Sequence, residues 1–230
     1  MDSHHGEHAQ PNGETLGEHV YREVRNRIRC GEWLPGTRLT LRALADELRT
    51  SVQPVRYAIG KLAAEQALIF RPNSSVALPP IDRRLLDEIF SMRNMLEADA
   101  ARRSTERFTE EDLAALEEAV KATRQHYVTG GAIRDRIVAI NNVALILADR
   151  SGSSILAEQI MSLRTRTSPY YAAAMTRDHI NNLDFVTFTT QLQNEFLMAV
   201  RRRHAVEAEA IRKADLYTFQ QYIYRTLKLI

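Results

Sequence analysis

The sequence predicts a mostly helical protein in two parts, a small head containing a β-hairpin and a larger C-terminal helical bundle. Three observations lead to this prediction. Apolar residues recur at helical spacing along most of the 230 residues. Two short apolar runs within 67–78 flank a turn sequence, which is typical of a hairpin. Beyond Pro79-Pro80 the helical spacing continues to the end of the chain. We therefore divide the chain into a disordered polar tail (1–14), a head (15–79) and a bundle (80–230).

The bulk composition is that of a soluble globular protein without extreme charge. The hydrophobic fraction is 44% and the formal net charge is only +2. Between residues 14 and 80, ten Lys or Arg stand against seven acids, so any nucleic-acid contact must be local. The single cysteine, Cys30, excludes an intrachain disulfide and favours a reducing, cytoplasmic setting. No apolar run approaches the length of a membrane span, so we expect no membrane partner.

The first helix of the head is expected over 17–30. Val20, Val24 and Ile28 recur at four-residue spacing with charged residues between them, which gives one apolar face. Gly31 can end this helix. The dipeptide Pro35-Gly36 then marks a turn.

Two further helices follow within the head. Thr40 is a suitable N-cap for a helix over 41–48. Thr50-Ser51 forms the turn and the next N-cap, and the second of these helices runs over about 52–66. Pro54 falls in its first turn, where a missing N–H costs little. The exposed face of this helix is expected to carry Gln53, Arg56, Tyr57 and Gly60.

A helix, a turn, a second helix and a hairpin follow one another in the order of a winged helix-turn-helix. That fold places its second helix in a DNA major groove. Ser51, Gln53 and Arg56 can then face base edges, while Arg42 and Lys61 can reach phosphates. The alternative is that the arginines are solvated surface residues. Two arginines at motif positions, beside a turn and a wing, favour DNA contact.

The bundle is expected to contain six helices. Gly130-Gly131 and Ser151-Gly152-Ser153 are clear breaks between them, and Thr109 followed by three acids marks a helix start. The expected ranges are 81–104, 109–128, 132–150, 153–168, 178–203 and 204–229.

The head sequence resembles the DNA-binding domain of the GntR family of bacterial transcription factors. The segments that carry this likeness read PGTRLTLRALADEL, TSVQPVRYAIGKLAAEQAL and PNSSV, with Ser51, Pro54, Val55 and Arg56 as its specific core. Further on, MRNMLEADAARRS is similar to the opening helix of the FCD-type effector domain, whose Arg-x-x-Leu-Glu pattern falls on Arg93, Leu96 and Glu97. The resemblance covers about 15–230 and points to the FadR-like branch of the family.

The resemblance implies particular DNA contacts. Arginines that contact DNA in the family fall on Arg42 and Arg56. Val52 and Tyr57 stand where relatives often have Arg and Glu, so we expect an atypical operator half-site. Val52 could pack on a thymine methyl, and Gln53 could pair with adenine. The predicted DNA-binding set is Arg42, Ser51, Val52, Gln53, Pro54, Arg56, Lys61, Arg71 and Asn73.

The same resemblance implies a divalent metal held by one Asp and three His inside the bundle. In this chain the four ligand positions fall on Ile140, Ala144, Gln193 and Asp215. The first two cannot ligate a metal, so we assign no cofactor and a transition metal is disfavoured. A hard cation bound by the oxygens of Asp215, Gln193 and Asn141 or Asn142 stays open as an alternative.

A cavity could persist without the metal and bind an organic anion instead. Arg93 is the family position that often points into it, and an arginine surrounded by amides suits a carboxylate. The predicted effector-binding set is Arg93, Asn141, Asn142, Arg164, Gln193 and Asp215. The alternatives are an Arg93–Glu97 pair along one helical turn and a solvated face at Asn141-Asn142.

Taken together, the sequence predicts a homodimeric DNA-binding transcriptional regulator. It would recognise palindromic half-sites, and a small organic anion in the bundle would modulate its operator affinity. The alternative is a ligand-independent regulator whose bundle serves only to dimerise. We expect no enzyme, because the chain lacks nucleophile, phosphate-loop and HExxH motifs. The sequence names neither effector nor operator, and does not decide between repressor and activator.

Overall fold

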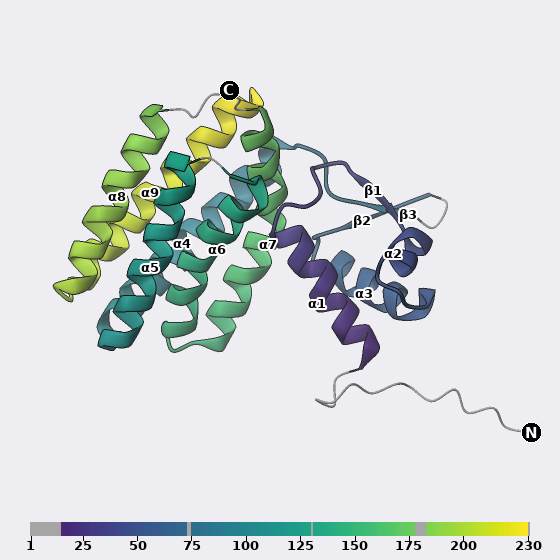
Figure 1. The fold of residues 1–230 in the computed structure, drawn as a ribbon, viewed down its shortest axis with the longest axis horizontal. Coiled ribbons are helices and arrows are strands. Elements are labelled where there is room, and N and C mark those ends of the chain that lie inside the picture. Colours follow the sequence, from purple (N-terminus) through teal and green to yellow (C-terminus); the bar gives the residue numbers. More distant parts are fainter. Residues whose placement is uncertain (1–14, 73–74, 130, 178–182, 230) are drawn as a thin grey trace, which may run out of the picture.

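The computed structural model describes residues 15–72, 75–129, 131–177 and 183–229, which form a head and a bundle placed side by side (Figure 1). No helix within these ranges is long and apolar enough to cross a membrane. The predicted tail, 1–14, lies outside them. The head contains α1 (Leu16–Arg29), β1 (Arg38–Thr40), α2 (Leu41–Glu47), α3 (Val52–Ala64), β2 (Ile69–Arg71) and β3 (Ser75–Ala77). The bundle contains α4 (Arg83–Arg107), α5 (Glu110–Thr129), α6 (Ile133–Arg150), α7 (Ser154–Arg177), α8 (Leu183–Arg201) and α9 (Ala205–Leu227).

The head folds around the apolar face predicted for its first helix. Val20, Val24 and Ile28 of α1 are almost fully buried and pack in one core with residues of α2 and α3 such as Leu44 and Ile59. The N-cap predicted for α2 is present, because the Thr40 hydroxyl accepts a hydrogen bond from the backbone N–H of Ala43 at 3.2 Å. Ser51 occupies the N-cap position of α3 without making a side-chain capping bond.

The wing has one strand more than the sequence predicted. β2 and β3 form the expected hairpin, and β1 pairs with the other edge of β3, so the sheet order is β1-β3-β2. β1 has only three residues, and its partner β3 lies more than thirty positions away along the chain. No local sequence pattern therefore predicts this strand. Nearby, Gly36 has φ +81°, and its N–H lies 3.1 Å from the Leu78 carbonyl and 3.2 Å from that of Pro79.

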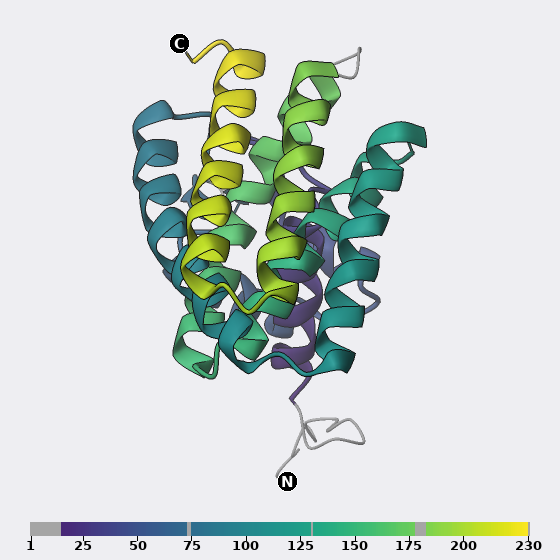
Figure 2. The same cartoon turned by 90° about the vertical axis from the view of Figure 1, so that its left-hand side faces the viewer.

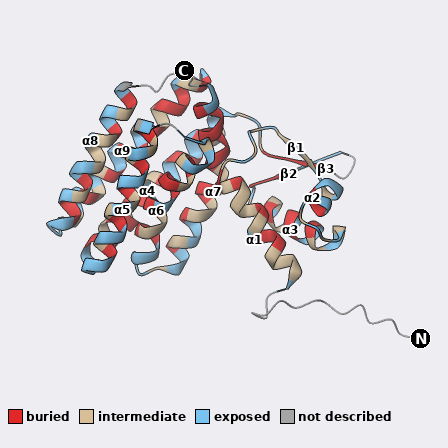
Figure 3. Ribbon diagram, in the orientation of Figure 1, coloured by how far each residue is buried: buried red, intermediate tan, exposed pale blue. Residues whose placement is uncertain are grey.

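The six helices predicted for the bundle are present, with one clear difference in length. We expected the fourth to end at 168, but α7 continues to Arg177 with Pro169 inside it. A proline in a helix interior costs about 3 kcal/mol or more. Here the following turns, Tyr170 to Met175, are buried in the bundle core, and this packing favours continuation of the helix. Figure 3 shows buried residues on the facing sides of the helices and exposed residues on their outer sides.

The head is docked on the bundle through α1 and α7, which lie against each other (Figure 1). Gly31 follows α1 with φ +71°, and a Cβ there would lie 2.4 Å from Cδ1 of Ile137. The Tyr170 hydroxyl donates a hydrogen bond of 3.0 Å to the Pro80 carbonyl. The Pro79-Pro80 segment is therefore bonded to both parts. Figure 2 shows α8 and α9 side by side on the opposite side of the bundle.

Candidate DNA-binding face and buried bundle site

The exposed face of α3 is the first candidate site. Ser51, Gln53 and Arg56 are exposed at its N-terminal end, while Val52 and Pro54 are half-buried beside them. Within the described residues, Arg56 and the exposed Arg42 of α2 make no hydrogen bond or ion pair. Both guanidinium groups are thus available to a base edge or a phosphate. The exposure of Gln53 and Arg56 agrees with the exposed face predicted for this helix, and their contact with DNA stays a prediction.

Lys61, another predicted DNA contact, is engaged within the head. Its Nζ atom lies 3.0 and 3.1 Å from the two carboxylate oxygens of Glu18 in α1, and 4.0 Å from the centre of the Tyr21 ring. The Tyr57 hydroxyl also donates to Glu18. The hydrogen bonds from Tyr57 and Lys61 lower the pKa of Glu18. Tyr57 and Lys61 therefore join α3 to α1, on the side of the helix next to the Arg56 face.

Arg71 is the predicted DNA contact in the wing. Arg71 is exposed at the end of β2, opposite Ser75 in the strand pairing. The neighbouring Phe70 is 69% exposed, a large value for an aromatic residue in a small sheet. Asn73, the remaining predicted DNA contact, lies outside the described residues.

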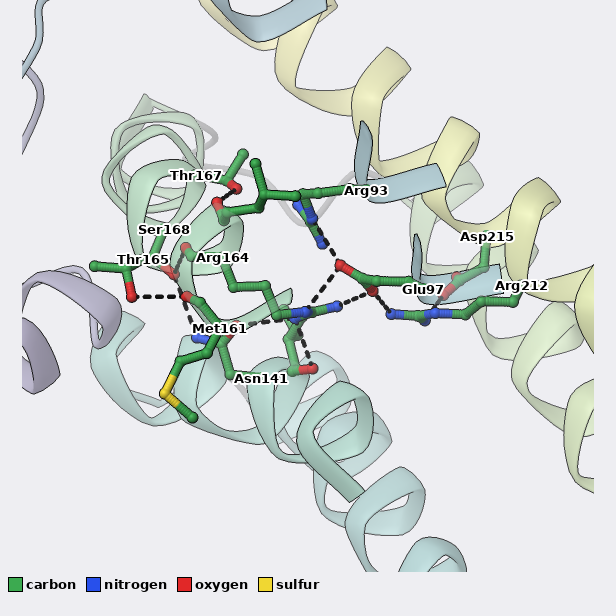
Figure 4. Close-up of polar contacts among 12 residues, drawn as sticks. Arg93, Glu97, Asn141, Met161, Arg164, Thr165, Thr167, Ser168, Arg212 and Asp215 are labelled. Carbon is green, nitrogen blue, oxygen red and sulfur yellow. Dashed lines mark hydrogen bonds and ion pairs between the residues drawn. The ribbon is translucent and has the colours of Figure 1, made fainter. Parts of the chain in front are cut away.

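A network of buried charges forms the second candidate site, with Glu97 of α4 at its centre (Figure 4). One carboxylate oxygen of Glu97 accepts hydrogen bonds from Arg93 Nε at 2.8 Å and Arg164 Nε at 3.0 Å. The other accepts from Arg164 Nη2 at 2.7 Å and Arg212 Nη2 at 2.6 Å. The arginines come from α4, α7 and α9, so a single carboxylate joins three helices.

The network extends outward from each arginine. Arg212 Nη1 donates to Asp215 at 2.7 Å, and the other oxygen of Asp215 accepts from the Thr189 hydroxyl at 2.9 Å. Arg93 Nη1 lies 2.6 Å from the Tyr171 hydroxyl. With three guanidinium groups and two carboxylates, this set of residues has one excess positive charge.

Burial and ion pairing act against each other on these groups. Burial opposes ionisation of Glu97, but the adjacent guanidinium groups of Arg164, Arg93 and Arg212 hold its pKa well below its ordinary value. Burial lowers the pKa of Arg164 to about 10 despite Glu97, which leaves that guanidinium charged at neutral pH. Burial also raises the pKa of Asp215, although Arg212 and Thr189 favour its ionised form. Glu97 is therefore the firmly ionised acid of the site.

A small cavity borders this network and contains buried polar atoms without partners. Among the atoms of the described residues, Arg93 Nη2, Arg212 Nε and Gln193 Oε1 have no hydrogen-bond partner. All three residues line the cavity, together with apolar side chains that include Phe196 and Phe219. The volume that the centre of a water molecule could occupy is about 30 Å³. This volume is enough for about two waters. Two arginines with unpartnered donors thus line a compact and largely apolar space.

The predicted effector residues occupy different places. Arg93, Arg164, Gln193 and Asp215 line the cavity. Asn141 is buried behind Arg164, where its Oδ1 accepts from Arg164 Nη1 at 2.9 Å. Asn142 is exposed and lines a separate groove beside α1. Sequence reasoning did not include Arg212, and it treated Glu97 only as a possible partner of Arg93. The spacing of three residues between Arg212 and Asp215 was the available signal, because such residues face each other on a helix.

The residues at the family's metal positions do not fit a cation. Ile140 and Ala144 are buried apolar residues, and the Asp215 carboxylate is already paired with Arg212. The alternative oxygen set is not assembled either, because Asn141 Oδ1 bonds to Arg164 and Asn142 lies outside the cavity. Across the described ranges, no three His, Cys, Asp or Glu residues are grouped so that they could hold a metal. Guanidinium groups supply positive charge beside the cavity.

Comparison with known protein families agrees with both parts of the fold. Residues 16–78 match the model of bacterial regulatory proteins of the gntR family, and residues 88–228 match the FCD domain. The chain belongs to the GntR family. Its head is accordingly a DNA-binding domain, and the chain is a transcriptional regulator with an FCD bundle, as the sequence predicted.

Individual relatives extend this likeness along nearly the whole chain. The HTH-type transcriptional regulator McbR of Escherichia coli (strain K12) is 30% identical over 216 residues, covering 90% of this chain and 95% of McbR. The solved structure of E. coli McbR/YncC matches with a TM-score of 0.85 and 25% identity, covering 93% of this chain and 99% of that one. A transcriptional regulator from Rhodococcus sp. RHA1 has the same fold, with a TM-score of 0.71 and 18% identity over 91% of this chain and 97% of its own.

Proposed function

We propose that this GntR regulator binds operator DNA as a homodimer and that a small organic anion in its bundle cavity modulates this binding. The observation that carries the effector proposal is the pair of buried, unpartnered donors, Arg93 Nη2 and Arg212 Nε, beside an apolar cavity. A buried donor without a partner costs about 1–3 kcal/mol. A carboxylate would satisfy both donors by charge-assisted hydrogen bonds.

The charge of the site supports an anion rather than a neutral ligand. The three arginines exceed the two acids by one charge, and one added carboxylate would balance this excess. Beside these charged groups, residues such as Val120 and Phe196 provide apolar surface in the cavity. We therefore favour a ligand with one carboxylate and a short apolar body, and its binding requires the cavity to widen beyond its volume of about 30 Å³.

The proposed DNA complex uses one α3 helix from each protomer. Two helices related by a two-fold axis would contact two half-sites of a palindrome. Arg56 and Gln53 are proposed to contact base edges, and Arg42 and Arg71 the backbone. Lys61 contributes less in this proposal, because Glu18 already pairs with it.

DNA binding is tested with fluorescently labelled DNA from upstream of the protein's own gene. We expect sequence-selective binding that weakens as salt increases, because phosphate contacts release counterions. A scrambled duplex of equal length and composition is the control. Equal affinity for both duplexes over the salt range would contradict the DNA-binding proposal.

The effector proposal is tested by thermal unfolding in the presence of short monocarboxylates and dicarboxylates. A ligand that binds the folded state raises the melting temperature, and the same compound should change operator affinity. Arg212→Met is the control variant, since it removes one unpartnered donor. The alternative, a ligand-independent regulator, is favoured by the small cavity volume of about 30 Å³. That alternative predicts neither a thermal shift nor an effect on operator affinity.

A further inference from the structure

Asn141 of α6 lies between the buried charge network and the docked head. On one side its Oδ1 accepts the hydrogen bond from Arg164 Nη1. On the other, its Nδ2 donates to the Arg29 carbonyl at 3.0 Å and to the Ser168 hydroxyl at 3.3 Å. Arg29 is the last residue of α1, and Asn141 is only 3% exposed. A single buried amide thus joins the cavity arginine to the end of the first helix of the head (Figure 4 shows the Arg164 side).

We propose that Asn141 is a positioning residue that couples the state of the cavity to the docking of α1 on the bundle. The inference deepens the proposed function and rests on it, since it names how the same site acts on the DNA-binding head. It gives Asn141 a different role from the effector contact suggested by the sequence.

The coupling follows from the shared partners of Arg164. Its Nε and Nη2 bond to Glu97, and its Nη1 bonds to Asn141 and to the Ile140 carbonyl at 3.3 Å. Glu97 in turn is shared with Arg93 and Arg212. An anion at the unpartnered donors of Arg93 and Arg212 attracts the same two guanidinium groups that bond to Glu97. Glu97 and Arg164 then adjust to the new positions of these groups. A planar guanidinium that is bonded at all three nitrogens cannot turn without changing its bond to Asn141.

The head side of this link has little room to absorb a change. The residue after the α1 C-cap is Gly31, where even a Cβ would lie 2.4 Å from Ile137 and 3.0 Å from Ala172 Cβ. Arg29 Nη1 also lies 3.6 Å from Met161 Sδ in α7. Such close packing favours a small number of discrete arrangements over continuous deformation. An effector shifts the equilibrium between these arrangements only if it binds one arrangement more tightly than another.

Cys30 offers a direct measurement of this docking. It is the single cysteine of the chain, it is 6% exposed, and it lines the groove formed by Arg29, Asn141 and Asn142. Reaction of its thiol with a disulfide reagent therefore reports opening between α1 and the bundle. The measurement requires neither the operator nor the effector.

The first test compares Asn141→Asp with Asn142→Ala in the full-length protein. Asn141→Asp keeps an acceptor for Arg164 but loses the donor to Arg29, so we expect Cys30 to react about fivefold faster, the order of one net hydrogen bond. Asn142→Ala changes the exposed neighbour and should leave the rate unchanged. Ser168→Ala removes the second acceptor of Asn141 and the hydrogen bond from Ser168 to the Arg164 carbonyl, but it keeps the bond to Arg29, so it should have a smaller effect than Asn141→Asp. An unchanged rate in folded Asn141→Asp protein, checked by circular dichroism, would overturn the proposal.

The second test asks whether Asn141 transmits a change from the charge network to α1 or only holds α1 on the bundle. Arg212→Met perturbs the network at its far side, and we expect it to change the Cys30 rate at least threefold when Asn141 is present. In the Asn141→Asp background the same substitution should change the rate by less than 1.5-fold. Equal changes in both backgrounds would show that Asn141 transmits nothing. Because DNA binding is measured separately, that result would leave the proposed operator recognition intact.

Discussion

The arginines of the head and those of the bundle are the same residue type in opposite environments. Arg42 and Arg56 of the head are exposed, and neither bonds to any residue in the described part of the chain. Arg93, Arg164 and Arg212 of the bundle are buried and share the Glu97 carboxylate. A guanidinium in the head keeps its donors for an external partner, whereas each one in the bundle donates to Glu97 and to at least one further group inside the fold.

Because of this difference, we expect substitutions of the head arginines to change DNA binding and substitutions of the bundle arginines to change the stability of the fold. Removing an exposed arginine leaves nothing buried behind it, so we expect its cost to appear in DNA binding. Removing a member of the buried network leaves opposite charges without partners in a low-dielectric interior. The two unpartnered bundle donors, on Arg93 and Arg212, are the exception that suggests a ligand. The following predictions test the contrast, starting with the largest expected effect.

The largest effect is expected from Glu97→Gln. The substitution leaves three buried guanidinium groups around a neutral amide, and breaking a buried pair in this way costs about 3–5 kcal/mol. For a chain of this size, the melting temperature should fall by about 10 °C. Differential scanning calorimetry measures both quantities. A loss below about 1 kcal/mol would mean that solvent screens the network more than its burial indicates.

The stabilisation by Glu97 should also depend on pH. Its pKa in the folded protein lies well below the ordinary value of 4.5, so its contribution is complete above that pH and is lost as the pH falls through the folded-state pKa. Burial raises the pKa of Asp215, which acts in the opposite direction. We expect the difference in unfolding free energy between the native protein and Glu97→Gln to be constant near pH 7 and to shrink below about 4.5. Urea titrations from pH 7 to 3 would measure it, and a pH-independent difference would contradict this assignment.

Arg56→Ala should show the reverse pattern. Loss of a base contact costs about 1–3 kcal/mol of binding, or roughly 5- to 150-fold in operator affinity. Unfolding free energy should change by less than about 0.5 kcal/mol, since the side chain is exposed. Fluorescence anisotropy at fixed salt gives the affinity. Lys121→Ala, an exposed change on α5, is the matched control and should leave affinity unchanged.

The smallest effect is expected from Arg42→Ala. A phosphate contact carries little sequence information, so specific and scrambled duplexes should lose affinity by similar factors. The slope of log affinity against log salt concentration should become shallower by about one. Titrations at four salt concentrations would determine this slope. A selective loss on the operator alone would assign Arg42 to base recognition instead.

Local sequence pattern was sufficient for most of the head. The apolar spacing in α1, the Thr40 cap and the turn before α3 are encoded within a few residues, and the structure has all three. The third strand was not predicted, because three residues at 38–40 carry no pattern of their own. The length of α7 was also missed. There the local signal from Pro169 favours a helix end, but burial of the following turns outweighs it.

The sequence by itself determined the helix-turn-helix head and the six bundle helices of the described residues. Each depends on residue type and short-range spacing. Only the tertiary structure decided that Glu97 pairs with Arg164 and Arg212, which lie 67 and 115 positions away, and that Asn141 bonds to Arg29. The physical reason is that buried polar groups must find partners wherever packing brings them. Those partners depend on how α1, α4, α6, α7 and α9 meet, which no short segment specifies.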